Sequence, residues 1–329
     1  MTPLYGHDEA VAAFRAGMES GRLHHGWLLA GPRGVGKALF ADKAALKVLA
    51  DAAGSAGGTP GFDIPDDHPT ARLVTAGSHP DLMRLERQMR ESGTDLARSI
   101  TVDQVRSLQR LFATTPSMSP WRAVVIDAID DLEAGGANAL LKNLEEPPPD
   151  TVFLLVSHAP ERLLPTIRSR CRLLRFSPLK DDVMASALEA ALPDAEQEEI
   201  AALVRIGEGA PGRAIAWRGL DVEMLDSAID ALVRAGDPTN ARRAALAQSL
   251  ALKSAQPRYE AFLARAPSRI AAEARKRRGP ALAAALKLWE RAQGLAGSAQ
   301  RLSLDPQATV FELAGMLAEL APEEGRDAA

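Results

Sequence analysis

The chain has 329 residues, enough for two or three domains that each bury a core of their own. Its formal net charge of −4 excludes a uniformly basic protein, so any contact with nucleic acid has to be local. The single cysteine, Cys171, excludes an intrachain disulfide and a zinc site built from several cysteines. The beginning of the chain lacks a secretory pattern and no apolar run is long enough to span a membrane, so we expect a soluble cytoplasmic protein.

The beginning of the chain predicts a helix, a strand and a second helix in that order. The first helix is expected over residues 8–20, where two acidic residues precede an apolar stripe. A short apolar strand follows at residues 27–30, and the second helix over residues 37–50. Residues 51–75 are rich in Gly, Pro and Asp and show no period, so we expect an exposed insertion without regular structure.

Strands and helices continue to alternate as far as residue 176. Thr101 and Gln104 form a capping box that predicts the start of a helix. The alternation predicts an α/β fold, a doubly wound parallel sheet with its ligand loop at the carboxyl ends of the strands. After Pro178 the strand signals cease, and we expect only helices. The further strands are expected at residues 81–87, 122–127, 152–157 and 172–176.

A phosphate-binding loop is indicated by Gly31, Gly34, Gly36 and Lys37, which have the spacing of a P-loop between a strand and a helix. Inward-pointing backbone N–H groups would hold phosphate oxygens there, and Lys37 would reach the outer phosphates. The alternative is a glycine turn beside a surface lysine, which the flanking strand and helix disfavour. Ala38 stands where a Ser or Thr hydroxyl would bind Mg²⁺.

The expected strand over residues 122–127 ends at Asp127, an acid suited to holding Mg²⁺ or, alternatively, to capping the next turn. Ala128 follows, where ATPases of this class carry a second carboxylate. Asp130 and Asp131 could in principle restore this carboxylate, but we expect them to lie where the chain has already turned away. Ser157 ends the next strand, either beside a γ-phosphate or as a hydroxyl that satisfies the turn. Two losses in one site predict a nucleotide fold that does not turn over nucleotide.

Arginines occupy alternate positions at 168, 170 and 172. Such alternation is typical of a solvated face, although an arginine that projects from one subunit can neutralise phosphate charge in its neighbour. On spacing alone the solvated face is preferred. The dense basic run Arg275–Arg278 is interpreted as favourable charge at a helix C-terminus, and a patch for DNA phosphate is the alternative.

Five stretches together resemble the bacterial DNA polymerase III clamp-loader AAA+ family, and in particular its delta-prime group. The resemblance is strong over residues 4–180 and weaker beyond them. The Ser-Arg-Cys element that ends the last stretch is highly specific. The stretches are Leu23–Trp27, Ser78–Leu82, Ile100–Arg106, Asn138–Pro148 and Leu164–Cys171.

The resemblance implies an AAA+ P-loop ATPase-like domain over residues 1–177, a small helical lid over 178–220 and an all-α collar for oligomerisation over 221–329. It implies that Arg170 is the finger offered to the ATP site of an adjacent motor subunit, and that Ser157 is the sensor-1 residue. The implied partners are tau or gamma motor subunits and delta in a five-subunit ring. Sliding clamp and primer–template DNA would be contacted through that complex, without a membrane.

The sequence departs from the family in two places. Many relatives carry a four-cysteine zinc module in the stretch that matches residues 51–75, and this chain does not, so neither zinc nor another metal is predicted. Gly212 stands where active motors place the sensor-2 arginine, and Arg213 is one residue away. We therefore expect that no cofactor is required. The loop is expected to bind ATP or ADP weakly, as a vestige, if it binds nucleotide.

The leading hypothesis is a clamp-loader subunit that does not hydrolyse ATP itself and completes a neighbour's site. The first alternative is an ATP-hydrolysing motor of the tau/gamma type, against which Ala38, Ala128 and Gly212 speak. A P-loop kinase or another nucleotide enzyme is a third hypothesis, disfavoured by the helical last third. Direct DNA binding as the main activity is a fourth, disfavoured by the net charge.

Overall fold

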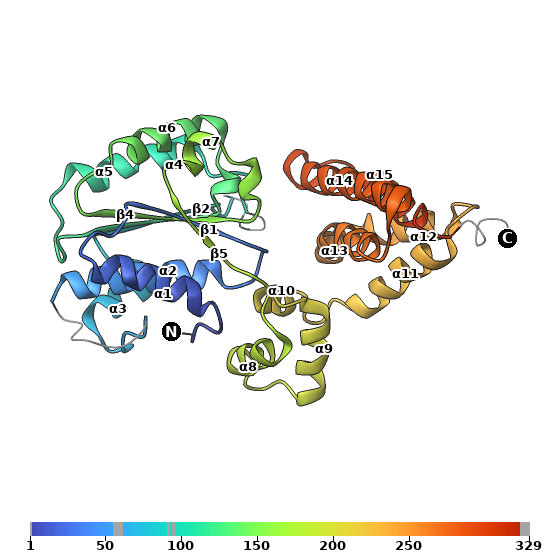
Figure 1. Ribbon diagram of the computed structural model, residues 1–329, viewed down its shortest axis with the longest axis horizontal. Helices are drawn as coiled ribbons and strands as arrows, with labels where there is room; N and C mark the ends of the chain where they lie inside the picture. Colours follow the sequence, from blue (N-terminus) through green and yellow to red (C-terminus); the bar gives the residue numbers. More distant parts are fainter. Residues whose placement is uncertain (1, 55–61, 91–92, 94–95, 323–329) are drawn as a thin grey trace. The chain divides into compact units, whose positions relative to one another are not determined.

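The computed structural model describes residues 2–54, 62–90, 93 and 96–322, and it divides the chain into two compact units, Met1–Ile215 and Ala216–Ala329 (Figure 1). Each unit buries its own apolar side chains. No helix among the described residues is long and apolar enough to cross a membrane.

A five-stranded sheet forms the centre of the first unit. All neighbouring strands are parallel, in the order β2-β3-β4-β1-β5. The order differs from the order in sequence, so helices have to cross between strands, as the alternating pattern predicted. The predicted doubly wound α/β fold of the P-loop class is confirmed. The strands are β1 (Gly26–Ala30), β2 (Leu82–Glu86), β3 (Arg122–Asp127), β4 (Thr151–Ser157) and β5 (Arg172–Arg175).

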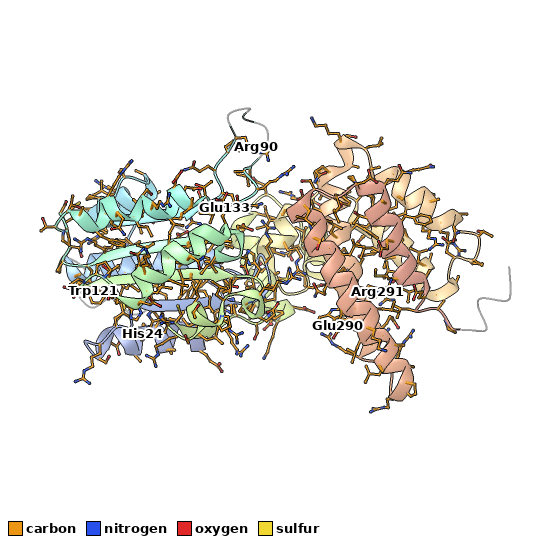
Figure 2. All side chains as sticks on the ribbon, turned by 90° about the horizontal axis from the view of Figure 1, so that it is seen from above. His24, Arg90, Trp121, Glu133, Glu290 and Arg291 are labelled. Carbon is orange, nitrogen blue, oxygen red and sulfur yellow. The ribbon has the colours of Figure 1, made fainter. Side chains whose placement is uncertain are left out.

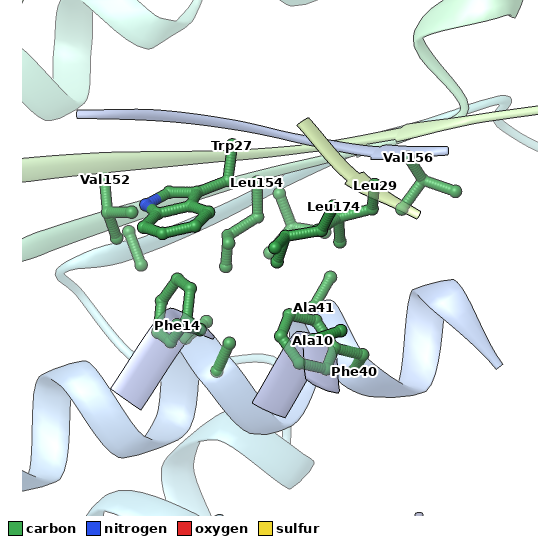
Figure 3. Close-up of a cluster of buried hydrophobic side chains, with 14 of the residues drawn as sticks. Ala10, Phe14, Trp27, Leu29, Phe40, Ala41, Val152, Leu154, Val156 and Leu174 are labelled. Atoms are coloured by element: carbon green, nitrogen blue, oxygen red, sulfur yellow. The ribbon is translucent and has the colours of Figure 1, made fainter. Parts of the chain in front are cut away.

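Helices cover both faces of the sheet (Figure 1). On one face Trp27 and alternate residues of the strands meet Phe14 and Phe40 in a fully buried cluster (Figure 3). On the other face Ile126 and Phe153 meet Leu140 in a second cluster. The first face carries α1 (Asp8–Glu19), α2 (Lys37–Ala52) and α3 (Pro69–Thr75); the second carries α4 (Val102–Arg106), α5 (Leu108–Ala113), α6 (Ala134–Glu145) and α7 (Pro165–Arg168).

The expectation of an irregular, exposed insertion over residues 51–75 was wrong in part: α3 is regular and Phe62 is buried, whereas residues 63–68 have no helix or strand and residues 65–67 are exposed. Residues 55–61 lie outside the described residues. Beyond them Phe62 is only 4% exposed, with its ring 5.1 Å from that of Phe40 and 5.7 Å from that of Phe14. His68 then caps α3 by accepting a hydrogen bond from the backbone of Thr70. The segment lacks a period because single large side chains, rather than a continuous face, hold it to the core.

Only helical elements follow β5 among the described residues, as predicted. The sheet unit ends with α8 (Asp181–Ala191), α9 (Gln197–Gly207) and the start of α10 (Pro211–Ala216). These helices share a compact unit with the sheet, and the predicted boundaries of a separate lid at 177/178 and 220/221 stay predictions. The capping box at Thr101 is present, with Thr101 and Gln104 bonded to each other's backbone.

The second unit is a helical bundle. Its α14 buries Ala285, Leu288 and Ala292 at helical spacing and exposes Glu290 and Arg291 (Figure 2). Arg269 of α13 reaches Asp230 of α11 at 3.0 Å. The α-helices that lie within the described residues of this unit are α11 (Val222–Ala235), α12 (Ala241–Leu250), α13 (Gln256–Ala274), α14 (Gly279–Leu302) and α15 (Pro306–Ala318).

The basic run Arg275–Arg278 lies between α13 and α14. Lys276 pairs with Glu273 at 2.8 Å, and Arg277 donates to the carbonyl oxygen of Leu320. Two of its four cations therefore bind groups of the same unit, which favours the interpretation as a helix end over that of a phosphate patch.

Candidate functional site

The P-loop residues occupy the turn between β1 and α2, which is the context that the motif requires. Gly34 and Gly36 have φ values of +80° and +114°, and α2 begins at Lys37. The Lys37 side chain folds back over its own loop, where its Nζ donates to the carbonyl oxygens of Gly31 at 2.6 Å and Pro32 at 2.5 Å. The ammonium group that would reach phosphate is bound to the loop instead.

Lys37 is also almost fully buried, at 2% exposure. Burial lowers the pKa of its ammonium from 10.5 to about 8, although the carboxylates of Asp130 and Asp127 act in the opposite direction. The ammonium of Lys37 therefore loses its proton at a lower pH than the ammonium of an exposed lysine.

Two other segments of the first unit cover the loop. The backbone N–H of Gly212, at the start of α10, donates to the carbonyl oxygen of Gly34 at 2.8 Å. A Cβ added to Gly212 would lie 3.1 Å from Gly34, so these two backbones are in direct contact. From the other end of the chain His7 donates from Nε2 to the carbonyl oxygen of Val35 at 2.9 Å. The sequence pattern does not indicate that His7 or Gly212 contacts the loop, so neither contact was predicted.

Arg213, the arginine one residue beyond the predicted sensor-2 position, pairs with Glu208 at 3.1 Å. Its backbone nitrogen is the atom that a Cβ on Gly34 would strike. The lid segment thus approaches the loop with its backbone, and the guanidinium of Arg213 forms an ion pair with a residue of that segment.

Asp127 ends β3 at the carboxyl edge of the sheet, as predicted. Its Oδ2 accepts a hydrogen bond at 2.9 Å from Arg84 of β2, a residue that the sequence argument passed over. The same guanidinium also pairs with Asp42 of α2 and with Glu86. The alternation along β2 indicates that Arg84 faces α2, but it could not name the carboxylates that Arg84 meets there.

The fold class implies Mg²⁺ between Ala38 and Asp127, and the residues present do not fit it. Ala38 supplies no oxygen, and the Asp127 carboxylate is already paired with Arg84. Among the described residues no group of three His, Cys, Asp or Glu side chains could hold a metal ion.

Ser157 ends β4 and is fully buried. Its hydroxyl donates to Asp130 at 3.0 Å, and the same carboxylate accepts the backbone N–H groups of His158 at 2.7 Å and Ala159 at 3.1 Å. The expectation that Asp130 turns away from the site was wrong, because a short 3₁₀ turn over Ile129–Asp131 directs its side chain to the end of β4. The Asp130 carboxylate thus satisfies the N–H groups of the turn after β4, and the Ser157 hydroxyl is bonded to the same carboxylate.

His158 is a further residue of this edge that the sequence argument missed. Burial lowers the pKa of its imidazole to about 3, and the nearby charges of Lys37, Arg33 and Arg87 act in the same direction. His158 is therefore neutral at physiological pH and adds no charge to the site.

Arg170 lies at the opposite edge of the sheet from the P-loop. Its carbonyl oxygen would be 3.2 Å from a Cβ on Gly26, the residue that begins β1, whereas the loop follows the end of β1. The guanidinium pairs with Glu145 of α6 at 2.9 Å and donates to the carbonyl oxygen of Thr166, and the side chain is 34% exposed. Arg172 stacks over Trp27 at 5.2 Å, so Arg170 and Arg172 have different surroundings.

A family model described as DNA polymerase III, delta subunit, matches residues 6–180, which is slightly more than half of the chain. The chain belongs to this family. The resemblance to the DNA polymerase III clamp-loader family that the sequence predicted is thereby confirmed.

Two relatives carry the name DNA polymerase III subunit delta-prime. The protein of Pseudomonas aeruginosa is 37% identical over 57% of this chain and 53% of its own length, and that of Bacillus subtilis is 33% identical over 52% and 47%. The match thus spans about half the length of these curated relatives. Among solved structures, a DNA polymerase III gamma subunit-related protein of Thermotoga maritima covers 95% of this chain and 98% of its own at 15% identity, with a TM-score of 0.41.

Proposed function

We propose that the chain is a delta-prime-like subunit of the DNA polymerase III clamp loader, a stator that does not hydrolyse ATP and offers Arg170 to a neighbouring motor subunit. The opposite placement of the P-loop and Arg170 on one sheet carries this proposal. The loop lies at the carboxyl end of β1, and Arg170 lies beside Gly26 at its amino end. An arginine placed at the amino end of β1 cannot serve the phosphate loop at the carboxyl end of the same strand, so a role at a phosphate group would have to be in another chain.

The state of the loop supports the absence of hydrolysis by this chain. The ammonium of Lys37 is bonded to carbonyl oxygens of its own loop, and the backbone N–H of Gly212 is bonded to the carbonyl oxygen of Gly34. Asp127 is paired with Arg84. Phosphoryl transfer needs a free cationic side chain, a metal and a group that orients water. No cofactor is required for the proposed role, and ATP or ADP would bind only weakly at the closed loop.

Arg170 is suited to acting in trans because it is positioned without being buried. Glu145 and the Thr166 carbonyl fix the direction of its side chain, which keeps about a third of its surface exposed. An arginine already held in place stabilises developing phosphate charge with little reorganisation. The proposed partners are tau or gamma motor subunits and delta in a pentameric ring, with sliding clamp and primer–template DNA reached through that complex in the cytoplasm.

The test is ATP turnover in a reconstituted loader whose other motor sites carry inactivating changes, with clamp and DNA present. We expect Arg170→Ala to reduce turnover at the remaining neighbouring site by about 10³-fold, the lower end of what an arginine finger supplies. Arg168→Ala, which removes an exposed arginine two residues away, is the matched control and should leave turnover unchanged. Size-exclusion chromatography shows whether each complex stays assembled.

Two outcomes would contradict the proposal. Unchanged turnover in an assembled Arg170→Ala complex would remove the role in trans. ATP turnover by the isolated chain that Lys37→Ala abolishes would favour the alternative, a motor of the tau/gamma type.

A further inference from the structure

Arg84 connects three elements at the carboxyl edge of the sheet. Its side chain leaves β2 on the same face as Leu82, toward α2, and is 31% exposed. One terminal nitrogen reaches Asp127 of β3 at 2.9 Å, the other pairs with Asp42 of α2, and Nε donates to Glu86 at 2.8 Å. All three nitrogens of the guanidinium therefore face carboxylates.

One of these carboxylates, Asp127, is the acid at the end of the strand that faces the metal side of a phosphate-binding loop. In active enzymes of this class, a divalent cation lies between the hydroxyl at position 38 and the acid at the end of the facing strand. Ala38 and Asp42 are four residues apart on α2, so they lie on the same face of that helix. Arg84 is bonded to this face through Asp42 and to the strand end through Asp127.

We propose that Arg84 takes the place of the divalent cation, so that the chain carries a built-in positive charge at this edge and does not bind Mg²⁺ there. The inference deepens the proposed function. It rests on that function in one respect, namely that the nucleotide site is degenerate.

A guanidinium suits this role because its donors are planar, permanently charged and directed to fixed positions. Charge-assisted hydrogen bonds from one group satisfy carboxylates that belong to a helix and two strands. A bound metal would be lost with the nucleotide, whereas Arg84 stays. The contact thereby fixes α2, which begins at Lys37, to β2 and β3 whether or not a nucleotide is present, as a rigid stator requires.

Metal-dependent thermal unfolding of the isolated full chain tests the proposal. We expect the unfolding midpoint of the wild type to change by less than about 1 °C between zero and about 10 mM MgCl₂ at constant ionic strength. Arg84→Gln removes the cation that Asp42, Glu86 and Asp127 share. As they stand, these carboxylates do not form a metal site, so binding requires their side chains to rearrange. The midpoint should rise by about 3–5 °C if the rearranged site binds Mg²⁺ with a dissociation constant of about 1 mM.

Two further variants sharpen the comparison. Arg15→Gln breaks an arginine–carboxylate pair of 3.0 Å on α1 and serves as the matched control, with no response to Mg²⁺ expected. The double variant Arg84→Gln/Asp127→Asn should lose the response, because it removes the central carboxylate.

A wild type that responds to Mg²⁺ as strongly as Arg84→Gln would overturn the proposal, and so would an Arg84→Gln chain that responds no more than Arg15→Gln. If Arg84→Gln fails to fold, titration of the wild type with Mn²⁺ followed by electron paramagnetic resonance decides. Stoichiometric binding that Asp127→Asn removes contradicts the proposal, and Mn²⁺ that stays free supports it. Neither measurement involves Arg170, so the two proposals can fail separately.

Discussion

The backbone N–H of Gly212 donates to the carbonyl oxygen of Gly34 at 2.8 Å, although the two glycines are 178 positions apart in the chain. Each glycine leaves room for the backbone of the other. The contact joins the start of α10 to the P-loop through a backbone carbonyl oxygen of the loop. The lid segment and the loop are thus parts of one packed structure.

Gly34→Ala is expected to weaken this contact. The added Cβ would strike the backbone nitrogen of Arg213, and φ at this position is +80°, where an alanine is strained. We expect the free energy of unfolding to fall by about 2–4 kcal/mol, as a sum of strain and displaced packing. Urea denaturation followed by circular dichroism measures the change.

Gly77→Ala is the matched control for Gly34→Ala. Gly77 has φ of +64° and nothing within 4 Å of an added Cβ, so the same substitution there introduces backbone strain without a collision. Its expected cost is about 1 kcal/mol. Equal losses in the two variants would show that the lid segment does not rest on the loop.

Phe62→Ala tests whether the segment after residue 61 belongs to the core. The ring of Phe62 meets those of Phe14 and Phe40 edge-on, so its loss leaves a cavity between α1 and α2. We expect the free energy of unfolding to fall by about 3–5 kcal/mol in urea denaturation. Met89→Ala, at a side chain that is 60% exposed, should change it by less than about 0.5 kcal/mol. A similarly small effect of Phe62→Ala would assign the segment to the surface.

The parts of the structure that depend on short sequence patterns were predictable from the sequence. Alternating strands and helices predicted the parallel sheet, and the glycine spacing placed the phosphate loop between β1 and α2. The capping box at Thr101 identified the start of α4 from four residues. In each case the signal and its consequence lie within a few residues of one another.

The contacts that the sequence did not predict join residues that are far apart in the chain. Phe62 is a single aromatic residue in a glycine-rich segment, and nothing near it indicates that it packs against α2. Arg84 meets Asp42 and Asp127, each more than 40 residues away. Asp130 returns to the site because a 3₁₀ turn follows β3. Local patterns predict elements, whereas these pairings depend on how the elements pack.

Lys37 is expected to give the chain an unusual dependence of stability on alkaline pH. Burial lowers the pKa of its ammonium from 10.5 to about 8 in the folded chain. Between these two values the unfolded chain binds a proton that the folded chain has released, so the contribution of Lys37 to the free energy of unfolding rises with pH. Below about pH 8 the buried charge lowers stability by a constant amount, on the order of 3 kcal/mol.

Lys37→Met removes this titration while keeping an apolar side chain of similar length. The free energy of unfolding of the wild type relative to Lys37→Met should therefore increase as the pH rises from about 8 to about 10.5, and stay constant from pH 6 to pH 7.5. Urea denaturation at each pH gives the difference, and Lys180→Met, at an exposed lysine, corrects for the loss of one positive charge. A difference that falls with rising pH would mean that Lys37 is stabilised in its charged form. The ammonium would then be held as in a loop prepared for phosphate, and the closed state of the site would have to be abandoned.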